Sequence, residues 1–140
     1  GTSSTVQDQL TSVLAAQRSL VIFAEGTTTA GDRVRTFHGR LLSAAIEAQV
    51  PTQPVAVAYR YAGERDSIAP FINDDEFSQH LWRLLGSKDI EVDVRFLPLL
   101  DSTRLNRNQL ARSAHASVCQ ALGLEDGRVE DETAEVKAAA

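Results

Sequence analysis

The sequence predicts an α/β fold with a partial, mainly parallel sheet, in which helices and strands alternate in the order α-β-α-β-α-β-α. The prediction follows from the order of the segments along the chain. Three short runs with strand character alternate with four segments of helical periodicity. Such alternation is typical of parallel strands joined by helical crossovers. Three strands make a small sheet for this architecture, so we expect them to belong to a larger one.

The first half of the chain supplies four of these elements. Apolar residues recur at helical spacing near the start, where Ser4 or Thr5 would cap the helix. Residues 19–24 form an apolar run that predicts a buried strand. Residues 37–49 predict a second helix, which Pro51 ends. Its apolar face is Leu41, Leu42, Ala45 and Ile46, and its polar face is Arg40, Ser43 and Glu47.

The second half begins with residues 54–61, a β-rich run that places Val55, Val57, Tyr59 and Tyr61 on one face. A third helix, capped by Asp74 or Asp75, should follow. Residues 90–98 alternate strictly between apolar and polar side chains, which predicts a strand near a sheet edge with one face in water. A last helix is expected over residues 106–122. Its inward residues would be Leu110, Ala111, Ala114, Val118 and Leu122.

Composition describes an ordinary globular chain. Of the 140 residues, 43% are apolar and 24% charged, which is enough to bury a core. The net charge is −5, and residues 124–140 carry most of it with six acids and two bases. We therefore predict a folded portion over residues 1–123 and an acidic, flexible tail over 124–140. The body has no broad basic field, which argues against nucleic acid as a partner.

The most informative stretch is "LVIFAEGTTTAGDR", residues 20–33, where an apolar run stops at Glu25. Gly26 and Gly31 permit close backbone approach, and three threonines add hydroxyl donors. Arg33, Arg35 and Arg40 make the region positive. A loop at a strand end with these properties suits an anionic ligand. A solvent-exposed crossover loop explains the same residues equally well.

The residues also carry a family resemblance. "IFAEGTTTAG" resembles the Phe-Pro-Glu-Gly-Thr block of the glycerolipid acyltransferases, the 1-acylglycerol-3-phosphate acyltransferase family. "VPTQPVAVAY" is similar to that family's following Val-Pro block, with Pro54 at the second proline. Residues 70–86 and 90–98 resemble members that acylate lysophospholipids or lyso-ornithine lipids. The resemblance runs from about residue 6 to residue 123 and implies the C-terminal part of an acyltransferase-like fold.

The resemblance implies an acceptor site on this loop. Glu25, Gly26 and Thr27 would line the pocket for the polar head of a lysolipid, with Thr28 and Arg33 beside them. Ala24 stands where the family usually has proline. Thr28 stands where many members have arginine, which removes a bidentate donor for a phosphate.

The family's catalytic pair is a histidine followed five positions later by an aspartate, which together activate the acceptor hydroxyl. The three histidines of this chain, His38, His80 and His115, are followed at that distance by serine, leucine and glutamine. We therefore expect the pair upstream of this chain. The sequence contains no methionine, even at position 1, which also suggests a piece of a longer protein. The isolated chain should then be inactive.

The resemblance also sets the expected partners. They are acyl-CoA or acyl carrier protein as donor, a lysophospholipid as acceptor, and a membrane surface. We expect no cofactor, and a single cysteine without clustered histidines argues against a metal site. We expect the protein on the cytoplasmic side of the membrane, peripheral or anchored by a segment upstream. A sheet lacking its other strands should expose an apolar edge, so we also expect self-association.

Three alternatives compete with parts of this interpretation. The chain could be a non-enzymatic module that binds an anionic ligand through residues 25–31. His115 and Cys119 lie four apart on a helix and could form a nucleophile pair of a small hydrolase. Trp82, beside the apolar stripe of the third helix, could contact a membrane, although a partly buried structural role is the more common one.

Overall fold

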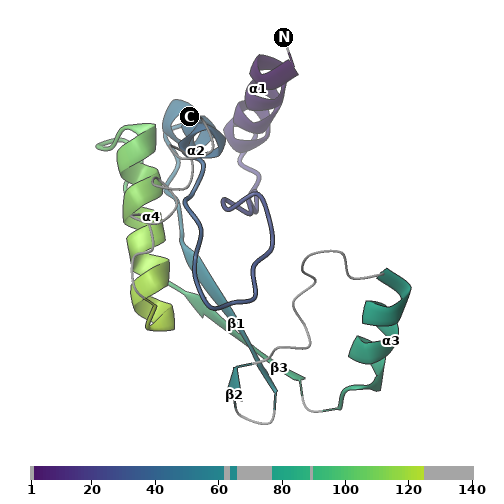
Figure 1. Ribbon diagram of the computed structural model, residues 1–140. Coiled ribbons are helices and arrows are strands. Elements are labelled where there is room, and N and C mark those ends of the chain that lie inside the picture. Colours follow the sequence, from purple (N-terminus) through teal and green to yellow (C-terminus); the bar gives the residue numbers. More distant parts are fainter. Residues whose placement is uncertain (1, 62–63, 66–76, 89, 125–140) are drawn as a thin grey trace, which may run out of the picture.

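The computed structural model describes residues 2–61, 64–65, 77–88 and 90–124. Helix α1 (Thr2–Ala15) and helix α2 (Gly39–Glu47) precede strand β1 (Val55–Tyr61) and the short strand β2 (Glu64–Arg65). Helix α3 (Phe77–Gly86), strand β3 (Ile90–Phe96) and helix α4 (Arg107–Leu122) follow. Helix α4 lies along the sheet, α1 and α2 gather at one end, and α3 stands apart near the other end (Figure 1).

The sheet is antiparallel, which corrects the prediction of a parallel sheet. Its order is β2-β1-β3, and β1 pairs with β3 along its whole length, from Val55 opposite Phe96 to Tyr61 opposite Ile90. A parallel pair would need the connecting helix to cross back over the sheet. Helix α3 lies beyond the strand ends instead, so the chain returns as in a long hairpin (Figure 1). The edge position predicted for β3 is confirmed.

The apolar run at residues 19–24 is not a strand, so the predicted alternation of elements is also wrong. Val21 and Phe23 are more than 80% exposed, and among the described residues the segment pairs with no strand. An apolar sequence indicates that burying the segment would be favourable. Whether the segment forms a strand also depends on a neighbouring strand whose backbone can hydrogen-bond to it.

The four predicted helices are present, although their ends and faces differ in places. Helix α1 starts at Thr2, so Ser4 and Thr5 lie inside it and do not cap it. In α2, Ser43 is buried and donates a hydrogen bond to the carbonyl oxygen of Arg40, 2.7 Å away, although its pattern placed it outside. Asp74 and Asp75, the expected caps of α3, lie outside the described residues.

Helix α4 contributes residues to both core clusters of the described part of the chain. Asn106 caps its start, and Gln109 completes a reciprocal capping box. One core cluster joins its buried Val118 and Cys119 to Val34 and Ala56, and a second joins Leu110 and Ala111 to Leu42. Phe37 packs against both clusters. The loop between α1 and α2 is therefore fastened to the core at its C-terminal end.

Candidate functional site

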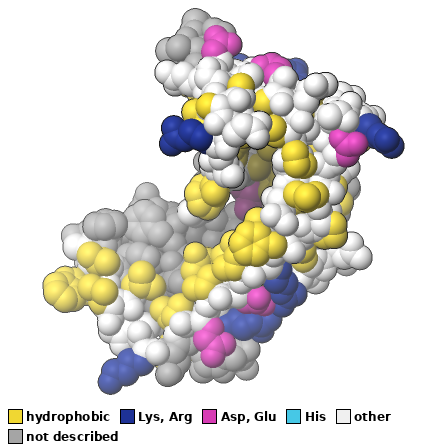
Figure 2. All heavy atoms as spheres, turned by 180° about the vertical axis from the view of Figure 1, so that it is seen from behind, with side chains coloured by type: hydrophobic (Ala, Val, Ile, Leu, Met, Phe, Trp, Pro, Cys, Tyr) yellow, Lys and Arg dark blue, Asp and Glu magenta, His cyan; other side chains and the backbone are white. Residues whose placement is uncertain are grey.

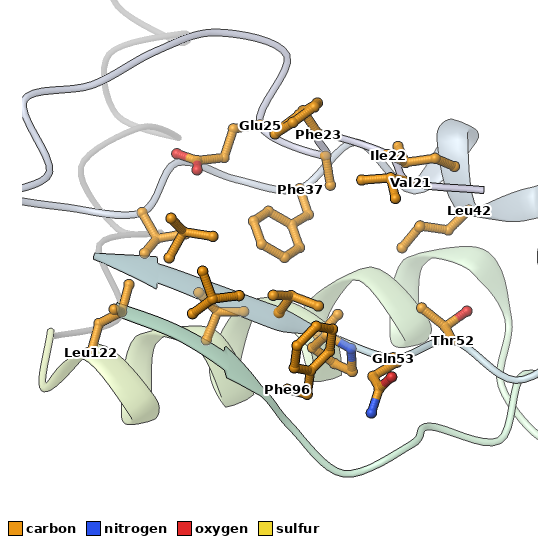
Figure 3. A pocket seen from close by; sticks show the side chains of 18 of the residues that line it. Val21, Ile22, Phe23, Glu25, Phe37, Leu42, Thr52, Gln53, Phe96 and Leu122 are labelled. Atoms are coloured by element: carbon orange, nitrogen blue, oxygen red, sulfur yellow. The ribbon is translucent and has the colours of Figure 1, made fainter. Parts of the chain in front are cut away.

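A large cleft separates the loop between α1 and α2 from the open face of the sheet (Figure 3). Its volume is about 1520 Å³. Residues of the loop form one wall, with Glu25 and Phe23 along it, and β1 and β3 form the other. Figure 2 shows hydrophobic side chains gathered around the hollow. The cleft is therefore apolar on the sheet side and partly polar on the loop side.

The sheet presents its larger apolar side chains to this cleft and not to the core. Val57 is 42% exposed and its cross-strand partner Val94 is 48% exposed, whereas Ala56 is buried. The small alanine lets α4 approach the opposite face closely. The sequence correctly grouped Val55, Val57, Tyr59 and Tyr61 on one face. It could not tell that this face would stay open, because that depends on where α4 packs.

The polar face of β3 faces α4. The guanidinium of Arg95 donates a hydrogen bond from Nη1 to the carbonyl oxygen of Ala121, 2.8 Å away, near the end of α4. It also pairs with Asp93, and this hydrogen bond lowers the pKa of the Asp93 carboxyl below its ordinary value. The charged residues that predicted a wet face thus help to fasten the last helix to the sheet.

The Glu-Gly-Thr loop is held by bonds within itself. The amide of His38 donates to the carbonyl oxygen of Ala24 at 2.9 Å, which closes the two ends of the loop. The amide of Arg35 donates to Oε2 of Glu25, also at 2.9 Å. The Oγ1 of Thr29 accepts from the amide of Gly31 and donates to the carbonyl oxygen of Arg33. These bonds define the shape of the loop, residues 24–38.

Four of the five predicted site residues line the cleft, namely Glu25, Thr27, Thr28 and Arg33. Gly26 does not line it. Its φ of +68° turns the chain between Glu25 and Thr27, and the ring of His38 lies directly against it. The contact of His38 with Gly26 could not be predicted from the sequence, because it depends on the closure of the loop. The same is true of the bond that the Glu25 carboxylate makes within the loop.

The Val-Pro block meets the same cleft. Pro54 is buried, lines the cleft and accepts a hydrogen bond from the amide of Leu97 at 3.0 Å. Thr52 and Leu100 form a bridge just beyond this pair. The block thus forms the end of the sheet that supports the cleft.

His115 and Cys119 do lie together, with Sγ 3.7 Å from Nδ1. Both side chains are buried, at 1% and 3% exposure. A nucleophile must reach its substrate, so this geometry argues against the hydrolase alternative. Trp82 is 74% exposed, which contradicts the expected structural burial.

Two kinds of feature are absent from the described part of the chain. Its residues contain no group of three or more His, Cys, Asp or Glu side chains placed to hold a metal ion. Within the same residues, no helix is long and apolar enough to cross a membrane.

Comparison with known proteins supplies the class. A family model described as Acyltransferase matches residues 1–58, the part that contains the Glu-Gly-Thr loop and the Val-Pro block. The resemblance seen in the sequence is confirmed: the family model and the relatives described next support a member of the acyltransferase family.

Two curated relatives make the similarity more specific, and both are named lyso-ornithine lipid O-acyltransferase. The protein from Pseudomonas aeruginosa is 46% identical over 122 residues, covering 87% of this chain and 47% of the relative. The protein from Brucella abortus is 37% identical over 114 residues, covering 71% of this chain and 43% of the relative. The chain thus spans about half the length of the curated relatives it matches. No solved structure matches it significantly.

Proposed function

We propose that this chain is the acceptor-binding part of an O-acyltransferase that moves an acyl group from acyl-CoA or acyl carrier protein to the hydroxyl of a lysolipid. The observation that carries the proposal is the 46% identity to a lyso-ornithine lipid O-acyltransferase over a region that includes the loop and the cleft. The cleft is suited to an amphipathic molecule, because polar threonines and apolar strand residues line the same space.

Lyso-ornithine lipid is the acceptor we favour over a phosphate-bearing lysolipid. The names of both relatives support this choice. Ornithine carries amine and carboxylate groups and no phosphate. The loop places both an acidic and a basic residue, Glu25 and Arg33, along the cleft, and has Thr28 where a phosphate-binding arginine would be expected. A head group of mixed charge fits these residues better than a phosphate does.

In this proposal the acyl chain of the lysolipid lies along the open face of β1 and β3. Val57, Val94 and Phe96 are between 42% and 71% exposed there. Covering them would remove apolar surface from water, which favours binding by roughly 25 cal/mol per Å² of apolar surface buried. The hydroxyl to be acylated would then lie between the sheet and the loop.

The acyl-transfer step needs a base on that hydroxyl. None of the chain's histidines has an acid five positions later. We propose that the chain supplies the acceptor site without the catalytic base, and that these 140 residues alone give no turnover.

We also propose that the protein works at the cytoplasmic face of a membrane, and that α3 touches the lipid surface. Trp82 and Leu85 are 74% and 67% exposed on this helix, and Arg83 and Lys88 add positive charge near its end. Exposed aromatic and aliphatic side chains with neighbouring cations are typical of helices that lie in a membrane interface.

The test is an acyl-transfer assay on the longest natural protein that contains this segment, with lyso-ornithine lipid and 1-acylglycerol-3-phosphate offered separately. We expect transfer to lyso-ornithine lipid. Thr27→Val removes a hydroxyl from the cleft and should raise the KM for the acceptor about five-fold, the effect of one hydrogen bond. Thr36→Val is the matched control, because Thr36 is exposed in the same loop but does not line the cleft.

Three results would count against the proposal. Equal KM values for the two variants would place the head group elsewhere. Preference for 1-acylglycerol-3-phosphate would remove the ornithine assignment. Absence of transfer to any lysolipid, together with binding of a simple anion to the loop, would favour the non-enzymatic module.

A further inference from the structure

His115 links helix α4 to the Glu-Gly-Thr loop, through a residue 81 positions away in the sequence. Its Nε2 lies 3.1 Å from the carbonyl oxygen of Val34, and its side chain is 1% exposed. A carbonyl oxygen can only accept, so Nε2 must carry a proton and donate it in this bond. The sulfur of Cys119 lies 3.7 Å from Nδ1 on the other side of the ring.

The ring is fixed in place by a second residue of the loop. Phe37 meets His115 edge to face, with ring centroids 5.3 Å apart and planes at 85°. Such an arrangement is favourable for aromatic pairs. His115 therefore contacts the loop through two residues, one by a hydrogen bond and one by its ring.

Val34 is the residue through which this contact can reach the proposed site. It is 5% exposed, whereas its neighbours Arg33 and Arg35 are exposed. Arg33 lines the cleft, and the amide of Arg35 bonds to the carboxylate of Glu25. The position of the Val34 peptide therefore determines where the Arg33 side chain enters the cleft. It also determines whether the Arg35 amide can reach the Glu25 carboxylate.

We propose that His115 is a positioning residue for acceptor binding: its bond to Val34 holds the loop in the shape that presents Glu25, Thr27 and Arg33 to the lysolipid head group. The inference rests on the proposed function for its consequence in activity. The structural part of the inference, that the His115 contacts hold the loop in one conformation, does not depend on that function.

The variants are chosen to separate the hydrogen bond from general packing. His115→Leu fills much of the volume and removes the donor. His115→Gln keeps an N–H at a similar reach, so it is the conservative replacement. Leu110→Ala is the control for apolar packing: Leu110 is fully buried on the same helix and belongs to the core cluster on which Phe37 packs, but it does not line the cleft and makes no polar contact with the loop.

The first measurement is amide hydrogen exchange in the 140-residue chain. We expect the Arg35 amide, which bonds to Glu25, to exchange about ten-fold faster in His115→Leu than in the wild type. The Leu97 amide, which bonds to Pro54, should be unchanged. His115→Gln should restore most of the protection of Arg35. Unchanged exchange at Arg35 in His115→Leu, or equal acceleration at Leu97, would overturn the positioning role.

The second measurement is steady-state kinetics in the longest natural protein that contains this segment. His115→Leu should raise the KM for lyso-ornithine lipid about ten-fold and leave the KM for the acyl donor unchanged, with His115→Gln close to the wild type. Leu110→Ala should lower thermal stability and leave the acceptor KM unchanged. An equal rise in both KM values, or the same rise in Leu110→Ala, would contradict the proposal.

The two measurements distinguish the possible failures. Fast exchange at Arg35 without acyl transfer by any version would retain the link between His115 and the loop and reject the proposed function. Acyl transfer with an unchanged Arg35 amide would reject the link and retain the function.

Discussion

Gly26 and Gly31 have similar left-handed backbones but different surroundings. Their φ angles are +68° and +77°, a region in which side chains with a Cβ are strained. A Cβ at Gly26 would meet Cδ2 of His38 at 3.3 Å, whereas a Cβ at Gly31 would meet nothing within 4 Å. The pair therefore separates the cost of the backbone turn from the cost of the contact with His38.

We expect Gly31→Ala to lower the free energy of unfolding by about 1 kcal/mol, the usual cost of this backbone region. Gly26→Ala should lower it by roughly 1 kcal/mol more, because the His38 ring must move. Urea denaturation of the two variants measures both values. Equal losses would mean that His38 does not constrain the loop.

Glu25 shows which part of the site could be predicted at this scale. The abrupt change from apolar to small polar residues located the loop, and the family resemblance implied a role in acceptor binding, which stays a prediction. Neither could predict that the Glu25 carboxylate accepts from the Arg35 amide, because that bond depends on how the following ten residues fold back. His38 and His115 were missed as partners of the loop for the same reason.

Among the elements, the bounds of β1 and the buried side of α4 followed the sequence prediction closely, whereas the covered face of β1 could not be predicted. Helical periodicity correctly gave Leu110, Ala111, Ala114 and Val118 as the buried side of α4. The alternation in β1 gave two faces but not the one that would be covered. The covered face of β1 is the one on which α4 packs, at Ala56. Local strand propensity does not indicate which face a helix will cover, because that depends on tertiary packing.

Helix α3 provides a spectroscopic test of the membrane proposal, because Trp82 is the one tryptophan in the sequence. We expect its fluorescence emission to shift to shorter wavelength when vesicles containing phosphatidylglycerol are added, since the ring would leave water. Neutral phosphatidylcholine vesicles should give a smaller shift, because Arg83 and Lys88 favour an anionic surface.

The matched variants are Leu85→Ser on α3 and Val6→Ser, an exposed aliphatic residue on α1 that does not line the cleft. Leu85→Ser should weaken vesicle binding several-fold, as expected for the loss of one inserted aliphatic side chain. Val6→Ser should leave it unchanged. Equal binding by both variants, or no shift of Trp82 with any vesicle, would reject α3 as the membrane contact.

For the molecule as a whole, the number and order of the helices were predictable, and the sheet topology was not. The apolar run at residues 19–24 and the helix between β1 and β3 together suggested a parallel arrangement. Antiparallel pairing of β1 with β3 reflects where α3 came to lie, away from the sheet (Figure 1). Whether two strands pair parallel or antiparallel depends on the path of the segment that connects them. The sequence of the strands alone does not determine it.

The open face of the sheet also has a consequence for the isolated chain. Val57, Val94 and Phe96 form part of an exposed apolar surface of the kind that marks association sites. We expect the 140-residue chain to self-associate at concentrations on the order of 100 μM, as measured by sedimentation velocity. Val94→Lys should shift the chain toward monomer, whereas Gln120→Lys, on the exposed side of α4, should not. A monomeric wild type at that concentration would contradict the expectation.

The claim that the loop holds the head group of a lysolipid acceptor can be tested most directly by photo-crosslinking. A lyso-ornithine lipid with a photoreactive group on its head is irradiated with the longest natural protein that contains this segment, and the adducts are mapped by mass spectrometry. We predict adducts within residues 25–35 that excess unlabelled lyso-ornithine lipid abolishes. Adducts confined to other parts of the protein, or adducts within 25–35 that the unlabelled lipid does not reduce, would contradict the account.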